Sequence, residues 1–264
     1  MPPGEEECHK NGTSNPETGS KWINDFELLT MDEYLDQPDL VDSHGDASFT
    51  GVWDAAKELA EYLLTNTKTN TNTNTNTNIG SPTRILELGS GTGWLGITLA
   101  RNGFGNNKSK DTSIIVLSDN PHNGAVQWTQ RNLDAAKTVQ QLPHLDNVQV
   151  VPLDWNDVAQ IRHVAKMQPW DLIIGSDLIY TEEGCCALAK TMAELLNQQQ
   201  QQSTTNNKCR ILYAHSQGRM PELDVLWKQQ LQLQGLTFQI VASKPQSWQN
   251  KDRTIIIGDI GLVS

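Results

Sequence analysis

Residues 84–100 read RILELGSGTGWLGITLA and decide the fold class of this chain. A short apolar run, residues 84–88, leads into a turn in which Gly89, Gly91 and Gly93 alternate with Ser and Thr, and an apolar stretch that reads as a helix follows. A glycine-rich turn between a strand and a helix lets the backbone approach a ligand closely, because glycine has no Cβ atom. We therefore expect a cofactor site at this turn.

The residues around the turn indicate which cofactor it holds. Glu87 lies just before it, and a carboxylate there would repel a phosphate and suit a cationic ligand. A dinucleotide-binding Gly-x-Gly-x-x-Gly loop needs its third glycine at position 94, where Trp94 would block the close packing of helix on strand. No Gly-Lys-Ser/Thr follows, as a phosphate-binding loop requires. The pattern favours a nucleoside cofactor without a pyrophosphate, S-adenosyl-L-methionine, over a turn that binds nothing.

Length and composition limit the class of protein. The 264 residues suffice for one α/β domain with appendages. No apolar run approaches the roughly 20 residues of a membrane helix, and the N-terminus lacks the pattern of a secretion signal. The four cysteines include no Cys-x-x-Cys pair, which indicates a reduced intracellular compartment and no zinc site. We expect a protein of the cytoplasm, or of the cytoplasm and the nucleus, that does not contact a membrane.

The net charge of −11 belongs to one end of the chain. Residues 1–54 hold 13 acidic and 2 basic side chains, while the remainder is balanced. An acidic chain without a basic stripe is not expected to bind nucleic acid. The acidic segment is either a solvated tail or an arm that attracts the basic surface of a protein substrate.

Changes in composition predict the domain boundaries. Residues 1–45 are expected to form an acidic, partly disordered segment, and residues 46–264 the folded domain. Two low-complexity stretches interrupt that domain: residues 65–78 alternate Thr and Asn, and residues 198–207 are rich in Gln, Ser, Thr and Asn. Such sequences cannot bury a core, so both are expected to be exposed loop inserts without a chemical role.

Outside the inserts, short apolar strands alternate with amphipathic helices, which implies a parallel sheet with helices on both faces. One helix is marked by Asn120 as N-cap and Pro121 in its first turn. Near the C-terminus, two strands at 236–242 and 254–260 follow each other without a helix between them. The predicted fold is therefore a Rossmann-like seven-stranded, mostly parallel sheet with helices on both faces and a C-terminal β-hairpin. The other expected strands are 84–88, 114–118, 148–152, 171–175 and 210–214, and the expected helices are 52–64, 94–102, 121–137, 158–166, 183–196 and 222–233.

Polar and aromatic residues follow four successive strands, at the edge where an open parallel sheet binds ligands. The glycine turn follows the first strand. Asp119 follows the second and is placed to accept hydrogen bonds from both ribose hydroxyls. Asp154 and Trp155 follow the third, where a carboxylate and an indole suit an adenine, and residues 176–180 follow the fourth. Each residue alone is more typical of a loop, cap or packing position, but together they indicate one ligand site.

Three motifs occur in an order that resembles methyltransferase family 16, the lysine methyltransferase group of the seven-β-strand methyltransferases. They are TGVWDAA at residues 50–56, ELGSGTG at residues 87–93 and Asp-Leu-Ile-Tyr at residues 177–180. The glycine motif is shared among methyltransferases, whereas the other two together are fairly specific to this group. The resemblance extends over roughly residues 45–262. It implies that S-adenosylmethionine contacts Trp53, Gly89, Ser90, Gly91, Asp119, Trp155 and Ser176, and that Asp177 and Tyr180 line the acceptor site.

The last motif also indicates the acceptor. Methyltransferases that act on adenine or on glutamine amides carry Asn/Asp-Pro-Pro-aromatic here, but Leu178 and Ile179 stand in place of both prolines. An aliphatic amine is therefore the favoured acceptor. A carboxylate beside an ammonium favours the charged form, so we expect Asp177, with Tyr180, to orient the amine rather than to act as a strong base. The alternatives are that Asp177 caps the next helix and that Tyr180 only packs.

These features predict an S-adenosylmethionine-dependent N-methyltransferase that acts on lysine side chains of a protein. The resemblance implies a cytosolic or nuclear substrate such as a chaperone or a translation factor, and we expect the enzyme to be a monomer. One alternative is a methyltransferase for protein histidine or a small amine. Another is a non-catalytic module that binds S-adenosylmethionine and acts through protein interaction.

Overall fold

One sheet of seven strands organises the part of the chain that the computed structural model describes, namely Leu28 and residues 51–68, 82–105, 113–140, 143–202, 209–248 and 251–263. The strands lie in the order β3-β2-β1-β4-β5-β7-β6. They are β1 (Arg84–Leu88), β2 (Ile114–Asp119), β3 (Val148–Pro152), β4 (Leu172–Ser176), β5 (Arg210–Gln217), β6 (Leu236–Trp248) and β7 (Lys251–Leu262). The helices are α2 (Asp54–Lys68), α3 (Trp94–Arg101), α4 (Ala125–Gln140), η2 (Pro143–Asn147), α5 (Val158–Met167), α6 (Glu182–Gln202) and α7 (Pro221–Leu233).

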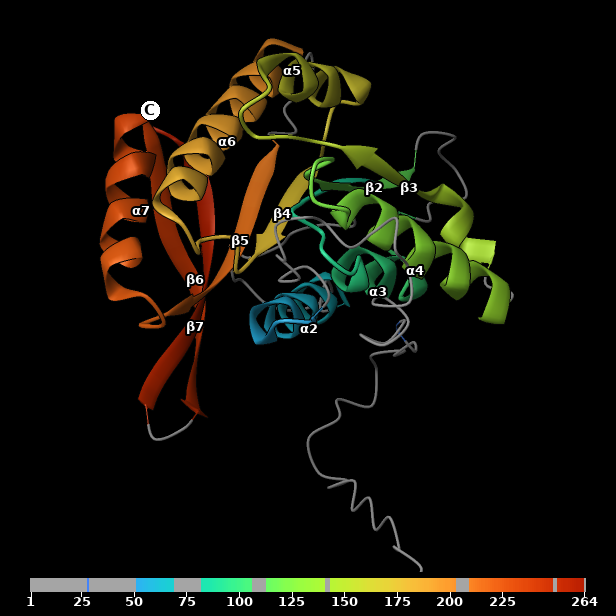
Figure 1. The fold of residues 1–264 in the computed structure, drawn as a ribbon, viewed down its shortest axis with the longest axis horizontal. Coiled ribbons are helices and arrows are strands. Elements are labelled where there is room, and N and C mark those ends of the chain that lie inside the picture. The colour runs from blue at the N-terminus through green and yellow to red at the C-terminus, as the bar shows by residue number, and fades with distance from the viewer. Residues whose placement is uncertain are drawn as a thin grey trace, which may run out of the picture.

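Strand directions confirm the predicted fold class. Strands β1 to β5 pair in parallel, whereas β7 runs antiparallel to both of its neighbours, β5 and β6. The hairpin of β6 and β7 therefore closes one edge of the sheet, and the ends of these two strands that pair Trp248 with Lys251 extend beyond the helices (Figure 1). The result is a mostly parallel Rossmann-like sheet with one strand reversed.

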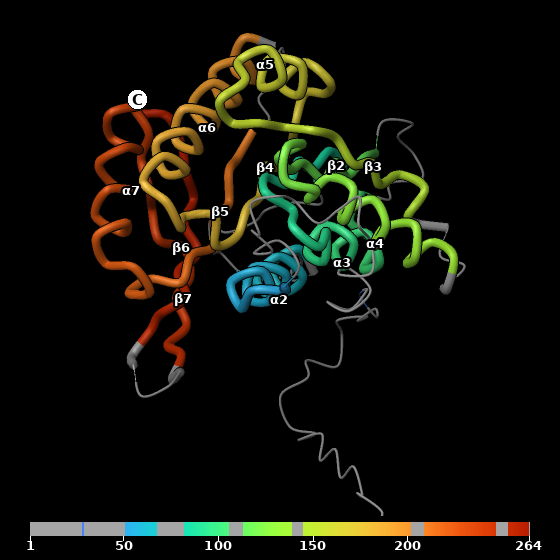
Figure 2. Tube along the Cα trace, viewed as in Figure 1, coloured from blue at the N-terminus to red at the C-terminus, as the bar shows by residue number. Residues whose placement is uncertain are grey.

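Helices cover both faces of the sheet, as Figure 2 shows along the chain trace. Helices α2, α3 and α4 pack on one face and α5, α6 and α7 on the other. The strands supply both cores because successive side chains point to opposite faces. In β1, for example, Ile85 belongs to the first core and Leu86 to the second, and both side chains are fully buried. This explains why the central strands are continuous apolar runs.

The register of the strands brings their carboxyl ends together. Leu88 at the end of β1 pairs with Ser118 of β2 on one side and with Gly175 of β4 on the other. Ser176 then pairs with Ala214 of β5. The loops that follow these strands consequently start side by side, which is the arrangement that the predicted ligand site requires.

One predicted helix start is wrong. Helix α4 begins at Ala125, four residues after Pro121. The Asn120 side chain accepts a hydrogen bond from the His122 N–H (2.9 Å), and the Asn123 side chain accepts one from the Ala125 N–H (3.1 Å). Both side chains thus stabilise turns, and the signal of an N-cap followed by proline marks the loop instead of the helix.

Two helices extend into the low-complexity stretches that were expected to be loops. Helix α2 continues to Lys68 and α6 continues to Gln202. Gln199, with 5% exposure, accepts a hydrogen bond from the Trp170 N–H (2.7 Å) and donates one to the Ala165 carbonyl (2.8 Å). The start of the glutamine run therefore joins α6 to α5. Residues 69–78 and 203–207, like the N-terminal segment apart from Leu28, lie outside the described residues. Along the described stretches, even the longest helix is too polar or too short to cross a membrane.

Candidate active site

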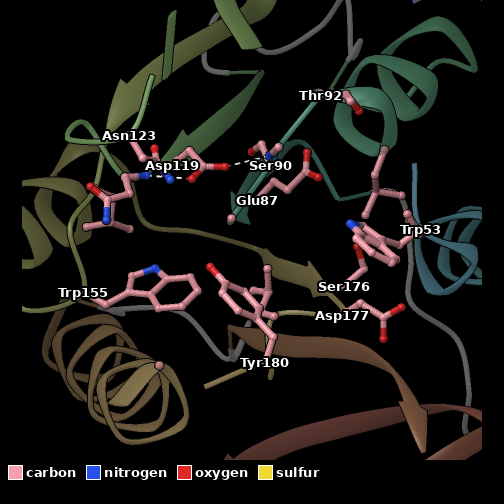
Figure 3. Close-up of a pocket in the computed structure, with 18 of the residues that line it drawn as sticks. Trp53, Glu87, Ser90, Thr92, Asp119, Asn123, Trp155, Ser176, Asp177 and Tyr180 are labelled. Carbon is pink, nitrogen blue, oxygen red and sulfur yellow. Dashed lines mark hydrogen bonds between the residues drawn. The ribbon is translucent and has the colours of Figure 1, made fainter. Parts of the chain in front are cut away.

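A cavity of about 350 Å³ opens at the carboxyl ends of the parallel strands (Figure 3). Its volume lies in the range typical of small-molecule sites, roughly 300–1,000 Å³. The loops after β1, β2, β3, β4 and β5 contribute to its wall, together with the start of α2. All residues that the sequence predicts for the site line it: Trp53, Glu87, Gly89, Ser90, Gly91, Asp119, Trp155, Ser176, Asp177 and Tyr180.

The glycine turn forms one side of the cavity. Gly89 has φ +58° and Gly91 has φ +55°, a backbone conformation that side chains disfavour. A Cβ atom on Gly89 would lie 2.4 Å from Cδ2 of Leu178, which belongs to the loop after β4. The backbone angle requires glycine here, and the short distance shows that the two loops are in direct contact.

Asp119 organises the glycine turn. Its carboxylate accepts hydrogen bonds from the N–H of Gly91 (2.6 Å) and from the N–H of Asn120 (2.7 Å). A carboxylate has about four acceptor positions, so holding the turn is compatible with the predicted binding of ribose hydroxyls. The sequence anticipated a ligand contact here, but it carried no signal for the bond to Gly91.

Glu87 lies behind the glycine turn. Its side chain is 2% exposed and accepts a hydrogen bond from the Gly96 N–H in α3 (2.9 Å). Burial is the largest influence on this group and raises the pKa of its carboxyl from 4.5 to about 8. The carboxyl is therefore mostly protonated at neutral pH, which corrects the prediction that its negative charge selects the ligand. Instead, Glu87 ties β1 to α3.

The loop after β3 supplies the aromatic wall. Trp155 is partly buried and packs against the α5–α6–α7 core, and Leu153 beside it is 1% exposed. Asp154 accepts a hydrogen bond from the Asn156 N–H (2.8 Å), and its second oxygen lies 3.6 Å from Nε2 of His122. This placement of an indole and a carboxylate fits the predicted adenine contact.

Asp177 does not present its carboxylate to the cavity. Only 4% of the side chain is exposed, and it accepts hydrogen bonds from the Ser216 N–H (2.7 Å) and the Ser216 hydroxyl (2.8 Å). Figure 3 shows the carboxylate directed away from Tyr180. The predicted orientation of an amine by Asp177 does not match this geometry. Asp177 also has φ +49°, which aspartate tolerates better than most residues, and it thereby fixes the bend of the loop onto β5.

The residues that follow Asp177 in its motif are also held by hydrogen bonds or by burial, whereas Tyr180 at the end of the motif is exposed. The N–H of Leu178 donates to the hydroxyl of Tyr213 in β5 (2.9 Å), and burial raises the pKa of that phenol well above 10.0. Thr181, not Asp177, caps α6, since its hydroxyl accepts from the Gly184 N–H (3.0 Å). Tyr180 remains 45% exposed at the cavity. Of the two predicted acceptor residues, only Tyr180 therefore places its functional group where a substrate can reach it.

Arg219 is a cavity residue that sequence reasoning missed. It lies in the loop between β5 and α7, and its guanidinium carbon is 4.2 Å from the centroid of the Trp53 ring. The other lining residues that carry a carboxyl group are Asp119, Asp154, Asp177 and Glu183, together with the mostly protonated Glu87. Among the described residues no His, Cys, Asp and Glu side chains are grouped as metal ligands.

Comparison with known proteins is consistent with this site. A family described as "Lysine methyltransferase" matches residues 36–222, well over half of the chain. The chain is 27% identical over 173 residues to protein N-lysine methyltransferase METTL21A of Danio rerio, covering 65% of each protein. It is 28% identical over 148 residues to protein-lysine N-methyltransferase EFM3 of Chaetomium thermophilum, covering 55% of this chain and 38% of the relative. The chain thus spans less than two thirds of the length of each of these relatives.

Solved methyltransferase structures are similar at a greater distance. Magnesium protoporphyrin IX methyltransferase from Synechocystis PCC 6803, with bound S-adenosylmethionine, aligns over 89% of this chain and 99% of that one. The identity is 15% and the TM-score is 0.47. The fold assignment rests on the strand order of this chain and does not depend on this match.

Proposed function

The chain belongs to the lysine methyltransferase family, and on that premise we propose that it is an S-adenosylmethionine-dependent N-methyltransferase acting on lysine side chains of a protein. The observation that carries the proposal is that the glycine turn and Tyr180, which is 45% exposed, line one cavity. A cofactor-binding element and a residue able to contact an acceptor are thereby placed in the same space. The names of the two relatives, both protein-lysine methyltransferases, support a protein as substrate.

The lining residues fit S-adenosylmethionine better than a phosphate-containing cofactor. Trp155 and Asp154 would hold the adenine, Asp119 the ribose, and the glycine turn with Ser176 the part that carries the sulfonium. Acids predominate in the wall, which disfavours a pyrophosphate. When bound, this cofactor supplies an electrophilic methyl group that an uncharged amine can accept.

The protein's task is to align an amine and to keep water away from it. A lysine side chain in water has a pKa of about 10.4, so it must lose a proton before it can react. The indole of Trp155 and the ring of Tyr180 enclose the cavity with apolar surface, and desolvation of the amine lowers its pKa. The Tyr180 hydroxyl then accepts a hydrogen bond from the amine, while Asp177 holds the loop that carries Tyr180.

The identity of the substrate is a further part of the proposal. We propose a cytoplasmic or nuclear protein such as a chaperone or a translation factor, methylated by a monomeric enzyme. An acidic N-terminal segment, in which residues 1–54 contain 13 acids and 2 bases, suits a substrate with a basic surface around its target lysine.

Two measurements test the proposal. Calorimetry should detect S-adenosylhomocysteine binding and no NAD binding. Incubation of the purified chain with cell extract and methyl-labelled S-adenosylmethionine should then place the label on lysine, as peptide mapping by mass spectrometry will show. Tyr180→Phe should reduce labelling about tenfold or more, which corresponds to roughly 1.4 kcal/mol, with little change in cofactor affinity. A label on glutamine, on a nucleobase or on a small metabolite would exclude this function.

A further inference from the structure

Arg219 and Trp53 form a pair across one end of the cavity. They come from opposite parts of the chain, Trp53 immediately before α2 and Arg219 between β5 and α7. The guanidinium lies over the indole at 4.2 Å from the ring centroid, a cation–π contact, and both residues line the cavity. No described carboxylate forms a salt bridge with this guanidinium. The positive charge therefore lacks an anionic partner within the described structure.

The loop that carries Arg219 is held in place from two sides. The N–H of Gly218 donates to the carboxylate of Asp224 (2.8 Å), and Asp224 also bonds to Nε2 of the buried His215. On the other side, the N–H of Arg219 donates to the Ser216 carbonyl (3.3 Å), and Ser216 binds Asp177. These bonds fix the backbone of the loop and the contact with Trp53 holds the guanidinium, which reduces the entropy lost on binding.

Charge selects what this end of the cavity can bind. Arg219 provides positive charge in a wall whose other ionisable residues are acids. A carboxylate elsewhere in the cavity would meet repulsion, whereas at Arg219 it meets a planar fork of donors that matches its geometry.

The order of the strands places this end relative to the rest of the site. Asp119 ends β2, the glycine turn follows β1, Ser176 ends β4 and Arg219 follows β5, and these strands are consecutive neighbours in the sheet. Figure 3 likewise shows Trp155 and Asp119 toward one end of the cavity and Trp53 with Ser176 toward the other. A ligand with its ribose at Asp119 and its adenine at Trp155 therefore has its opposite end near Arg219.

We propose that Arg219, stacked on Trp53, is a carboxylate-binding subsite, and that it takes the carboxylate of the amino-acid tail of the cofactor. This inference rests on the proposed function, because S-adenosylmethionine carries a carboxylate at the end remote from its adenine. The same chemistry could be supplied by an acidic side chain next to the target lysine in the substrate protein. Arg219 lies at the end of the cavity opposite the positions expected for ribose and adenine, which favours the cofactor as the source of the carboxylate.

Two nucleosides that differ in the tail distinguish these sources. S-adenosylhomocysteine has the carboxylate, whereas 5′-methylthioadenosine has the same adenine, ribose and sulfur without it. We expect Arg219→Gln to weaken S-adenosylhomocysteine about tenfold or more by calorimetry, as for loss of a charge-assisted hydrogen bond. The affinity of methylthioadenosine should stay within about twofold. Arg219→Lys, which keeps the charge without the planar fork, should lie between Arg219→Gln and the unmodified protein.

Arg162→Gln is the matched control, because Arg162 is 59% exposed on α5, where it pairs with Glu194. It should leave both affinities unchanged, and thermal melting of every variant checks folding. If both nucleosides bind Arg219→Gln normally but half-maximal labelling requires about tenfold more extract protein, the carboxylate belongs to the substrate. Equal losses for both nucleosides, or no effect on binding and labelling, would refute the subsite. Either result would leave the proposed function standing, since that is judged on the unmodified protein.

Discussion

Replacement of Asp177 separates two roles that the sequence motif alone cannot distinguish. The structure assigns the Asp177 carboxylate to holding the loop after β4 on Ser216, not to contact with the acceptor. If this is right, Asp177→Ala should lower the free energy of unfolding as well as the rate of methyl transfer. The effect on rate then follows from displacement of Tyr180, which the same loop carries.

The expected loss of unfolding free energy in Asp177→Ala follows from the contacts that the substitution removes. Alanine leaves the Ser216 N–H and hydroxyl without their acceptor, which costs about 1–3 kcal/mol. It must also adopt φ +49°, and a side chain less tolerant of the left-handed region than aspartate adds about 1 kcal/mol. We expect Asp177→Ala to destabilise the protein by about 2–4 kcal/mol in total. Asp177→Gly loses the same bonds without the backbone strain, so it should be about 1 kcal/mol more stable than the alanine variant.

The Asp177→Asn variant distinguishes the structural role of Asp177 from a role of its charge in catalysis. An asparagine accepts from the Ser216 N–H, can donate to the Ser216 hydroxyl oxygen and tolerates positive φ. It should retain stability to within about 1 kcal/mol and most of the methyl-transfer activity. Urea denaturation, calorimetry with S-adenosylhomocysteine and the labelling assay measure the three quantities. A stable Asp177→Asn variant that loses activity tenfold or more would refute the assignment, because a charged carboxylate would then be acting on the amine.

Three other residues give independent predictions. Gly89→Ala should lower both the melting temperature and the cofactor affinity, since the backbone has φ +58° and the new Cβ would lie 2.4 Å from a neighbouring side chain. Gly261→Ala is the control, because its Cβ would meet nothing closer than 3.7 Å. It should match the unmodified protein in melting temperature and in calorimetry. For Glu87 the folded pKa of about 8 exceeds the ordinary 4.5, so the folded state binds the proton more tightly and stability should fall as pH rises from about 4.5 to 8. Denaturation of Glu87→Gln across that range should show a smaller decline, and an identical slope would contradict the burial argument. Gln199→Ala should cost about 1–3 kcal/mol in urea denaturation by stranding the Trp170 N–H, while exposed Gln200→Ala should cost almost nothing.

Much of the fold could be predicted because its signals are local. An apolar run of five residues, a glycine turn and a helical stretch specify a strand, a turn and a helix at residues 84–101 without reference to the rest of the chain. The hairpin was predictable in the same way, since two strands follow each other without a helix between them. Helix ends were harder to predict. Gln199 extends α6 into the glutamine run through hydrogen bonds to Trp170 and Ala165. These partners lie 29 and 34 positions away in the sequence, so the composition around Gln199 does not reveal them.

In the candidate site, too, some features follow from the local sequence and others only from tertiary packing. The sequence by itself determined which residues stand at the ends of the strands, because the alternation of strands and helices fixes where each strand stops, and an open parallel sheet binds its ligands at the carboxyl ends. Only the tertiary structure decided where the functional groups point and how they are charged. The Asp177 carboxylate turns to β5 because of its φ and Ser216, and Glu87 is neutralised by the depth of its burial. Arg219 and Trp53 meet only because β5 and the start of α2 converge on one cavity. Side-chain direction and desolvation depend on packing between distant segments, which is a property of the folded chain.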